Sequence, residues 1–116
     1  MRIKSRCYPM DETEFEALAE RALERLEAAL EASGVDADVE RKEGGVLEIE
    51  FTDGSKMIVN RHGTAREIWV AAPRAGGFHF RWDGSLWRDT RDGGELFAAL
   101  SRLVSAQSGQ PVLLRP

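Results

Sequence analysis

Carboxylate side chains dominate the chemistry that the first half of this chain could perform. Residues 11 to 54 carry 15 Asp and Glu against 4 Lys and Arg, although the 116-residue chain as a whole has a formal net charge of −4. Carboxylate oxygens suit hard cations such as ferric iron, and less selectively ferrous iron, manganese, calcium or magnesium. The surplus therefore favours cations or a basic partner and disfavours nucleic acid at this part of the molecule.

A helix and a short strand could place eight of these carboxylates on one surface. Residues 11 to 32 have the apolar spacing of a helix, and its glutamates fall within an arc of roughly 80° at about 100° per residue. Residues 35 to 42 alternate acidic and apolar side chains, which predicts an edge strand protected by its charges. We expect the two segments to form a continuous acidic ridge of Glu16, Glu20, Glu24, Glu27, Glu31, Asp36, Asp38 and Glu40.

The residues of this acidic ridge would lie on an exposed surface, and their spacing does not predict an enclosed metal cage. We therefore expect weak, multiple and exchangeable metal binding that strengthens as the carboxylates ionise with rising pH. The alternative is a solvated helix face without a ligand, which is the usual role of a run of charges.

Capping residues specify where the first helix begins and ends. Asp11 as N-cap and Glu14 three residues later predict a capping box, in which the side chain of each residue accepts the backbone N–H of the other. Gly34 can adopt the left-handed conformation that ends a helix. We expect one domain over residues 11 to 116, preceded by a flexible N-terminal extension over residues 1 to 10.

The stretch from Gly44 to Phe80 contains four runs in which polar and apolar residues alternate, which predicts strands separated by turns. Two registers are open for the first hairpin. A two-residue loop pairs Ile49 with Ile58, whereas a three-residue loop with Gly54 in the left-handed conformation pairs Ile49 with Met57. Only the second register keeps the apolar side chains of both strands on one face, so we predict that register.

The remainder of the chain completes the predicted fold. Residues 86 to 89 form a short strand, and residues 95 to 107 have the apolar stripe of a helix packed on a sheet. Short turns between consecutive strands favour an antiparallel meander. We therefore predict an α+β fold, a two-layer α/β sandwich whose six-stranded antiparallel meander sheet is flanked by N- and C-terminal helices on one face.

The sheet face that the helices leave uncovered is predicted to hold a second site, made of Asn60, Arg61 and Trp69. If Ile68 and Val70 face the core, Trp69 faces outward, which is an unusual place for a large apolar side chain. Trp and Arg are enriched among the residues that dominate protein interfaces, so we predict a partner-binding surface. The alternative is that Trp69 packs under a loop and serves the fold alone.

Other classes of function have little support in the sequence. It contains no Gly-rich phosphate loop and no HExxH motif, and we predict no catalytic residue. His62 and His79 do not make a zinc or non-haem iron site by themselves, and we interpret His79 as a surface residue. No apolar run approaches the roughly 18 residues of a membrane helix, and the single cysteine, Cys7, cannot form an internal disulfide. We expect a cytoplasmic protein with no membrane and no nucleic-acid partner.

A set of short segments forms a recognisable signature. They are Asn60-Arg61, Ile68-Trp69-Val70-Ala71, Gly76-Gly77-Phe78-His79-Phe80 and Trp87, with the flanking runs GGVLEIEFTDGSKMIVNR and GGELFAAL. In order and spacing these segments resemble the core signature of the frataxin family, and more closely that of its bacterial CyaY branch. The resemblance covers about Asp11 to Arg115. One departure is Glu67, where the family usually has Gln before the hydrophobic-Trp pair.

This resemblance implies a function. Frataxins are similar in binding iron weakly on an acidic ridge and in contacting the cysteine desulfurase and the scaffold protein of iron–sulfur cluster assembly. It implies an accessory or regulatory protein that is not an enzyme, with ferrous or ferric iron as a weakly bound ligand. The alternatives are an acidic protein-interaction module without a metal role, and a ferroxidase. We expect a monomer and leave open whether iron drives oligomerisation.

Overall fold

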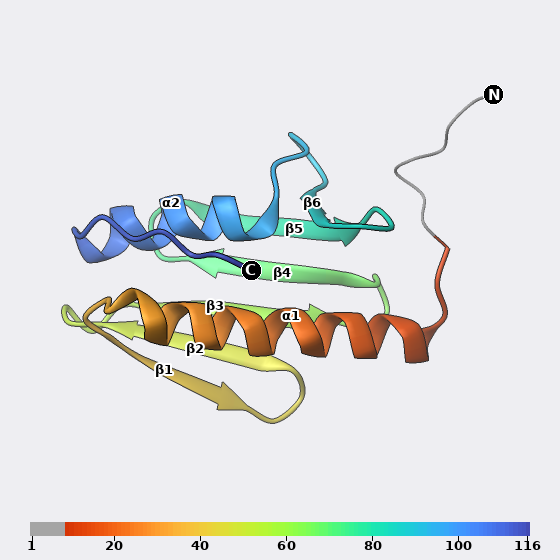
Figure 1. Ribbon diagram of the computed structural model, residues 1–116, viewed down its shortest axis with the longest axis horizontal. Helices are drawn as coiled ribbons and strands as arrows, with labels where there is room; N and C mark the ends of the chain where they lie inside the picture. Colours follow the sequence, from red (N-terminus) through yellow and green to blue (C-terminus); the bar gives the residue numbers. More distant parts are fainter. Residues whose placement is uncertain (1–8) are drawn as a thin grey trace.

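The computed structural model of this protein describes residues 9–116. The predicted flexible extension at residues 1 to 10 therefore lies almost wholly outside the described residues. Cys7 also lies outside them. The described chain forms a helix, six strands and a second helix in the predicted order. Figure 1 shows both helices on the same side of a single sheet, which confirms the predicted two-layer α+β fold.

The first helix, α1 (Glu12–Ser33), begins and ends as its capping residues predict. Glu14 N donates to Asp11 Oδ1 at 2.8 Å and Asp11 N donates to Glu14 Oε1 at 3.2 Å, so the capping box is present. Gly34 has a φ of 76°, in the left-handed region. One side of the helix is buried against the sheet through Phe15, Ala19, Ala22, Leu23, Leu26 and Leu30.

Six strands pair in sequence order, each antiparallel to the next. The first begins two residues later than predicted, because Val35 O accepts a hydrogen bond from Ala37 N at 3.0 Å in a tight turn. The strands are β1 (Ala37–Lys42), β2 (Val46–Phe51), β3 (Lys56–His62), β4 (Glu67–Ala72), β5 (Gly76–Trp82) and β6 (Trp87–Asp89).

The β2–β3 hairpin has the predicted register. Ile49 lies across from Met57, and both side chains are fully buried. Gly54 has a φ of 88°, and Phe51 N donates to Ser55 O at 2.8 Å across the loop. The turn therefore places the apolar side chains of both strands on the face that the helices cover, here called the inner face. The opposite, uncovered face is called the outer face.

The second helix, α2 (Leu96–Ser108), starts one residue later than predicted because Glu95 is its N-cap. The Glu95 carboxylate accepts the backbone N–H groups of Phe97 and Ala98 at 2.8 and 3.0 Å. Figure 1 shows the C-terminal tail running back along α2. Leu114 of this tail is buried, and its backbone N–H donates to Ser101 Oγ at 2.8 Å.

The hydrophobic core lies between the helix layer and the inner face of the sheet. Its largest fully buried side chains come from both helices and from β2 to β5. Within residues 9–116, no helix combines the length and the apolar character that crossing a membrane requires. The uncovered outer face and the solvent side of α1 are the surfaces that carry the predicted sites.

Candidate functional site

The glutamates of the predicted ridge that lie on α1 are here called the helix carboxylates, and they point away from the core. Three of them are exposed and two are half-buried. They lie three or four residues apart, so neighbouring like charges repel by roughly 0.2–0.5 kcal/mol per pair. The helix carboxylates are Glu16, Glu20, Glu24, Glu27 and Glu31.

Glu20 differs from the other helix carboxylates because it is paired with two arginines. Arg41 Nη2 on β1 donates to Glu20 Oε2 at 2.6 Å, and Arg61 Nη1 on β3 lies 3.7 Å from Glu20 Oε1. In the described part of the chain, the other members of the predicted ridge form no ion pair. Their charge is therefore free to attract a cation or a basic surface.

The acidic residues of β1 lie on the other side of the sheet. Ala37 and Val39 pack against the core, so the side chains that alternate with them lie on the outer face. Asp38 lies directly across from Glu50, and like charges in that position destabilise the pairing. The predicted continuous ridge is thus divided into the helix carboxylates and a second set, here called the strand carboxylates, which are Asp38 and Glu40 on β1 and Asp36 just before it.

Lysines partly balance the outer face beside the strand carboxylates. Glu40 lies across from Glu48, and Glu48 Oε1 is 3.2 Å from Lys42 Nζ and 3.8 Å from Lys56 Nζ. The hydrogen bond and the charge of Glu48, with a smaller contribution from Glu40, raise the pKa of Lys42 above its ordinary value. Lys42 therefore stays protonated to a higher pH than an ordinary lysine.

An acidic hollow of about 260 Å³ lies at the end of the β1–β2 pair. Asp36, Asp38 and Glu50 line it, so Glu50 is an acidic neighbour that the predicted ridge did not include. Among residues 9–116, no group of three or more His, Cys, Asp or Glu side chains is arranged to hold a single metal ion. These carboxylates can attract cations, but they do not form a preformed coordination shell.

The predicted sheet-face site is only partly assembled as expected. Asn60 and Trp69 are direct cross-strand neighbours on the outer face. Arg61 is not on that face: it lies across from the buried Ile68, and it reaches Glu20 on α1. Adjacent residues of a strand point to opposite faces, so Asn60 and Arg61 could not both be outward. Arg61 thus belongs to the helix layer.

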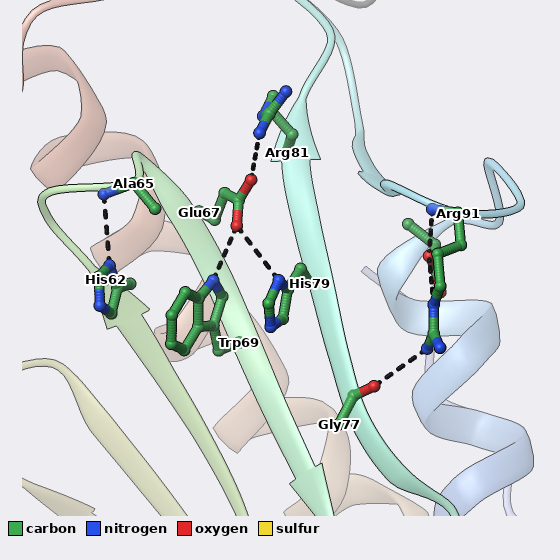
Figure 2. A network of polar contacts seen from close by, with 9 residues as sticks. His62, Ala65, Glu67, Trp69, Gly77, His79, Arg81 and Arg91 are labelled. Carbon is green, nitrogen blue, oxygen red and sulfur yellow. Dashed lines mark hydrogen bonds and ion pairs between the residues drawn. The ribbon is translucent and has the colours of Figure 1, made fainter.

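Glu67 organises the polar contacts around Trp69, as Figure 2 shows. Glu67 Oε1 accepts the indole N–H of Trp69 at 2.8 Å and lies 3.6 Å from His79 Nδ1. Its other oxygen, Oε2, accepts a hydrogen bond from Arg81. Although Glu67 is on the outer face, only 5% of it is exposed.

Two histidines enclose the indole ring of Trp69. The His62 ring stacks on it with centroids 3.8 Å apart and planes at 13°, and the His79 ring stacks with centroids 4.3 Å apart and planes at 7°. Ala65 N donates to His62 Nδ1 at 3.3 Å, which ties that ring to the β3–β4 turn. Trp69 is therefore held between side chains of β3 and β5 and not under a loop, and its role in binding a partner stays a prediction.

The sequence-based prediction missed His62, Glu67, His79 and Arg81 as parts of the sheet-face site. Glu67 lies across from both His62 and Arg81, and Trp69 lies across from His79. Strand alternation could have placed these residues on the outer face. The register of β3, β4 and β5 was needed to show that they touch, and the lengths of the turns between these strands do not fix it.

Comparison with known proteins gives consistent results. The family model described as "Frataxin-like domain" matches residues 8–110. A protein of Dechloromonas aromatica (strain RCB) named "Iron-sulfur cluster assembly protein CyaY" is 65% identical over 106 residues, which cover 91% of this chain and 100% of that relative. A protein of the same name from Cupriavidus metallidurans is 57% identical over 110 residues, covering 92% and 98% of the two chains.

Solved structures with the same fold agree with these relatives. Frataxin from Psychromonas ingrahamii, described as a CyaY-family protein, superposes with a TM-score of 0.83 at 30% identity, covering 92% of this chain and 100% of that one. Trimeric yeast frataxin complexed with ferrous iron superposes with a TM-score of 0.63 at 24% identity, covering 90% and 91%. The family model, the relatives and the fold together show that this chain belongs to the frataxin family, in its CyaY branch.

Proposed function

We propose that this protein is an accessory or regulatory protein of iron–sulfur cluster assembly. In this role it binds iron weakly through the helix and strand carboxylates and contacts a cysteine desulfurase and its scaffold protein. The names of relatives that are 65% and 57% identical over almost their whole length support the pathway. We further propose that it works as a monomer in the cytoplasm.

The observation that carries this proposal is the uncompensated charge of the helix carboxylates. Glu20 is paired with arginines, whereas Glu16, Glu24 and Glu31 are exposed and, within the described chain, form no ion pair. Exposed carboxylates bind hard cations without the selectivity of a closed site. They also attract a basic protein surface, which gives the desulfurase contact a physical basis.

Calorimetric titration with ferrous and with ferric iron tests the metal role. We expect weak binding that decreases in a variant with Glu24→Gln, Glu27→Gln and Glu31→Gln, because neutral amides are poorer ligands. Glu20→Gln is the matched control, since arginines already occupy the Glu20 carboxylate. If the wild-type protein binds neither form of iron, the metal role is wrong.

A pull-down with purified desulfurase, with and without ferrous iron, tests the partner. We expect capture that changes when iron is added. Capture that weakens with salt but is indifferent to iron would instead favour the acidic interaction module, because exposed charges are screened within about 10 Å at 0.1 M salt. Catalytic ferrous oxidation that saturates with iron and oxygen would favour the ferroxidase.

A further inference from the structure

Glu67 is the least exposed carboxylate on the outer face, and each of its two oxygens accepts a hydrogen bond from a neighbouring side chain. Oε1 accepts the Trp69 indole N–H, while Oε2 accepts from Arg81 across the β4–β5 pair. The side chain of Glu67 is 6% exposed, whereas that of Glu48 on the same face is 15% exposed and contacts only lysines. A carboxylate that is this enclosed needs its hydrogen-bond partners, because an unpaired buried charge is strongly unfavourable.

The stack of rings restricts Trp69 in a second way. His62 and His79 cover the two faces of the indole, and both ring planes are within 13° of the indole plane. The hydrogen bond to Glu67 fixes the one polar atom of the same ring. Figure 2 shows these contacts converging from β3, β4 and β5. Rotation of the indole would break the hydrogen bond and both stacking contacts together.

We propose that Glu67 is a positioning residue that holds Trp69 in one orientation before a partner binds, with the edge of the indole, and not its faces, presented to that partner. This inference rests on the proposed function and on the predicted partner-binding surface, because it takes Trp69 as the anchor of a sheet-face contact with the desulfurase–scaffold complex. A side chain that is already ordered loses less conformational freedom on binding. For one immobilised side chain that saving corresponds to about a 2- to 12-fold gain in affinity.

The acceptor oxygen matters more than the negative charge in this arrangement. Glu67→Gln keeps an oxygen that can accept the indole N–H of Trp69, whereas Glu67→Ala removes it. Arg81 is half exposed, so water can solvate its guanidinium when the partner charge is lost. We therefore expect Gln to preserve the orientation of Trp69 and Ala to release it.

Nuclear magnetic resonance of the free, ¹⁵N-labelled protein tests the positioning directly. The indole N–H of Trp69 should exchange with solvent at least about ten times faster in Glu67→Ala than in the wild-type protein, while Glu67→Gln stays near wild type. Trp82 and Trp87 form no hydrogen bond with Glu67 in the described structure and serve as internal references. Glu12→Ala removes an exposed carboxylate from α1 and is the matched control.

Desulfurase–scaffold binding by the same variants provides the second measurement. We expect affinity to fall about 2- to 12-fold in Glu67→Ala and to be restored in Glu67→Gln. Unchanged indole exchange in Glu67→Ala would overturn the inference whatever the binding result. Equal affinity of the wild-type protein and Trp69→Ala for the desulfurase–scaffold complex would instead show that Trp69 is not the anchor of a sheet-face contact. If Glu67→Ala folds poorly, Glu67→Met replaces it in the comparison with the wild type and Glu67→Gln, because Met keeps the side-chain volume and removes both oxygens.

Discussion

Glutamates of this protein have very different surroundings, although they are a single residue type. Glu20 is held by two arginines, Glu24 is exposed, and Glu67 is enclosed on the solvent side of the sheet. Pairing and exposure decide what each carboxylate can do, because a paired carboxylate has fewer free lone pairs for a cation or partner. A count of acidic residues therefore overstates the number available for binding.

Trp69 and Trp87 provide a matched pair of tryptophans for testing the sheet-face site. Trp69→Ala should weaken partner binding by about 2 kcal/mol or more while leaving the fold intact, because Trp69 lies outside the buried core. Trp87 is 4% exposed and packs edge-on against Phe15, with ring centroids 6.1 Å apart, so Trp87→Ala should cost about 3–5 kcal/mol of stability. Calorimetry and urea unfolding measure the two effects. If Trp69→Ala unfolds the protein, the ring serves the fold.

Asp83 links the stability of the β5–β6 turn to pH. Its Oδ1 accepts the backbone N–H groups of Ser85 and Leu86, both at 2.8 Å, and its Oδ2 lies 3.2 Å from Arg88 Nε. The backbone hydrogen bond from Leu86, followed by that from Ser85 and the contacts of Arg88, lowers the pKa of Asp83 below its usual 3.8. The folded state therefore binds the proton less readily than the unfolded state does.

The sign of the Asp83 effect follows from this lowered pKa. Its stabilisation is fully present above pH 3.8, where the unfolded carboxyl is ionised, and is lost as the pH falls through the folded pKa. Asp83→Asn should lower stability by about 1 kcal/mol at neutral pH and flatten the loss of stability below pH 4. Urea unfolding at a series of pH values measures both. If the free energy of unfolding falls equally steeply with pH in the two proteins, Asp83 does not contribute to the pH dependence of stability.

At the scale of elements, those features that depend on residues close together in the chain could be predicted from the sequence. The Asp11–Glu14 capping box and the hairpin around Gly54 follow from spacings of a few residues, and both are confirmed. The turns after β3 and β4 are no longer than the β2–β3 turn, but their residues do not indicate a loop type that fixes the register, so contacts across them could not be obtained in the same way. The stack on Trp69 needs the register of β3 with β4 and of β4 with β5. The correct place of Arg61 needs no register, because strand alternation alone puts it on the face opposite to that of Asn60.

The β1–β2 turn offers a test of how Arg61 is held in the helix layer. Gly44 and Gly45 have φ values of 86° and 77°. Alanine at either position would be held in a left-handed backbone conformation, which destabilises the folded state by about 1–2 kcal/mol. A Cβ on Gly45 would also lie 2.5 Å from Arg61 Cγ, whereas a Cβ on Gly44 meets no atom within 4 Å.

Gly45→Ala should therefore be measurably less stable than Gly44→Ala in thermal unfolding. The difference arises because Arg61 must move, and that movement disturbs its contact with Glu20. The Gly44 variant controls for the backbone cost that both share. Equal stability of the two variants would mean that Arg61 relocates freely and that its contact with Glu20 contributes little.

At the scale of the whole molecule, the fold places two different surfaces on opposite sides of the sheet. The helix carboxylates lie with α1 over the inner face, whereas Trp69 and its histidines lie on the outer face. The first surface is exposed, charged and largely unpaired. The second is partly buried, aromatic and held by hydrogen bonds. We expect surfaces of these two kinds to contribute to different steps of association.

Binding kinetics should separate the two surfaces. Replacing Glu24, Glu27 and Glu31 with Gln should lower the association rate and reduce its dependence on salt, because exposed charges act mainly by steering the encounter. Trp69→Ala should mainly raise the dissociation rate, because buried aromatic anchors hold the formed complex. Surface plasmon resonance with an immobilised desulfurase–scaffold complex at several salt concentrations measures both rates. If both variants change only the dissociation rate, the helix carboxylates make a direct contact and do not act at a distance.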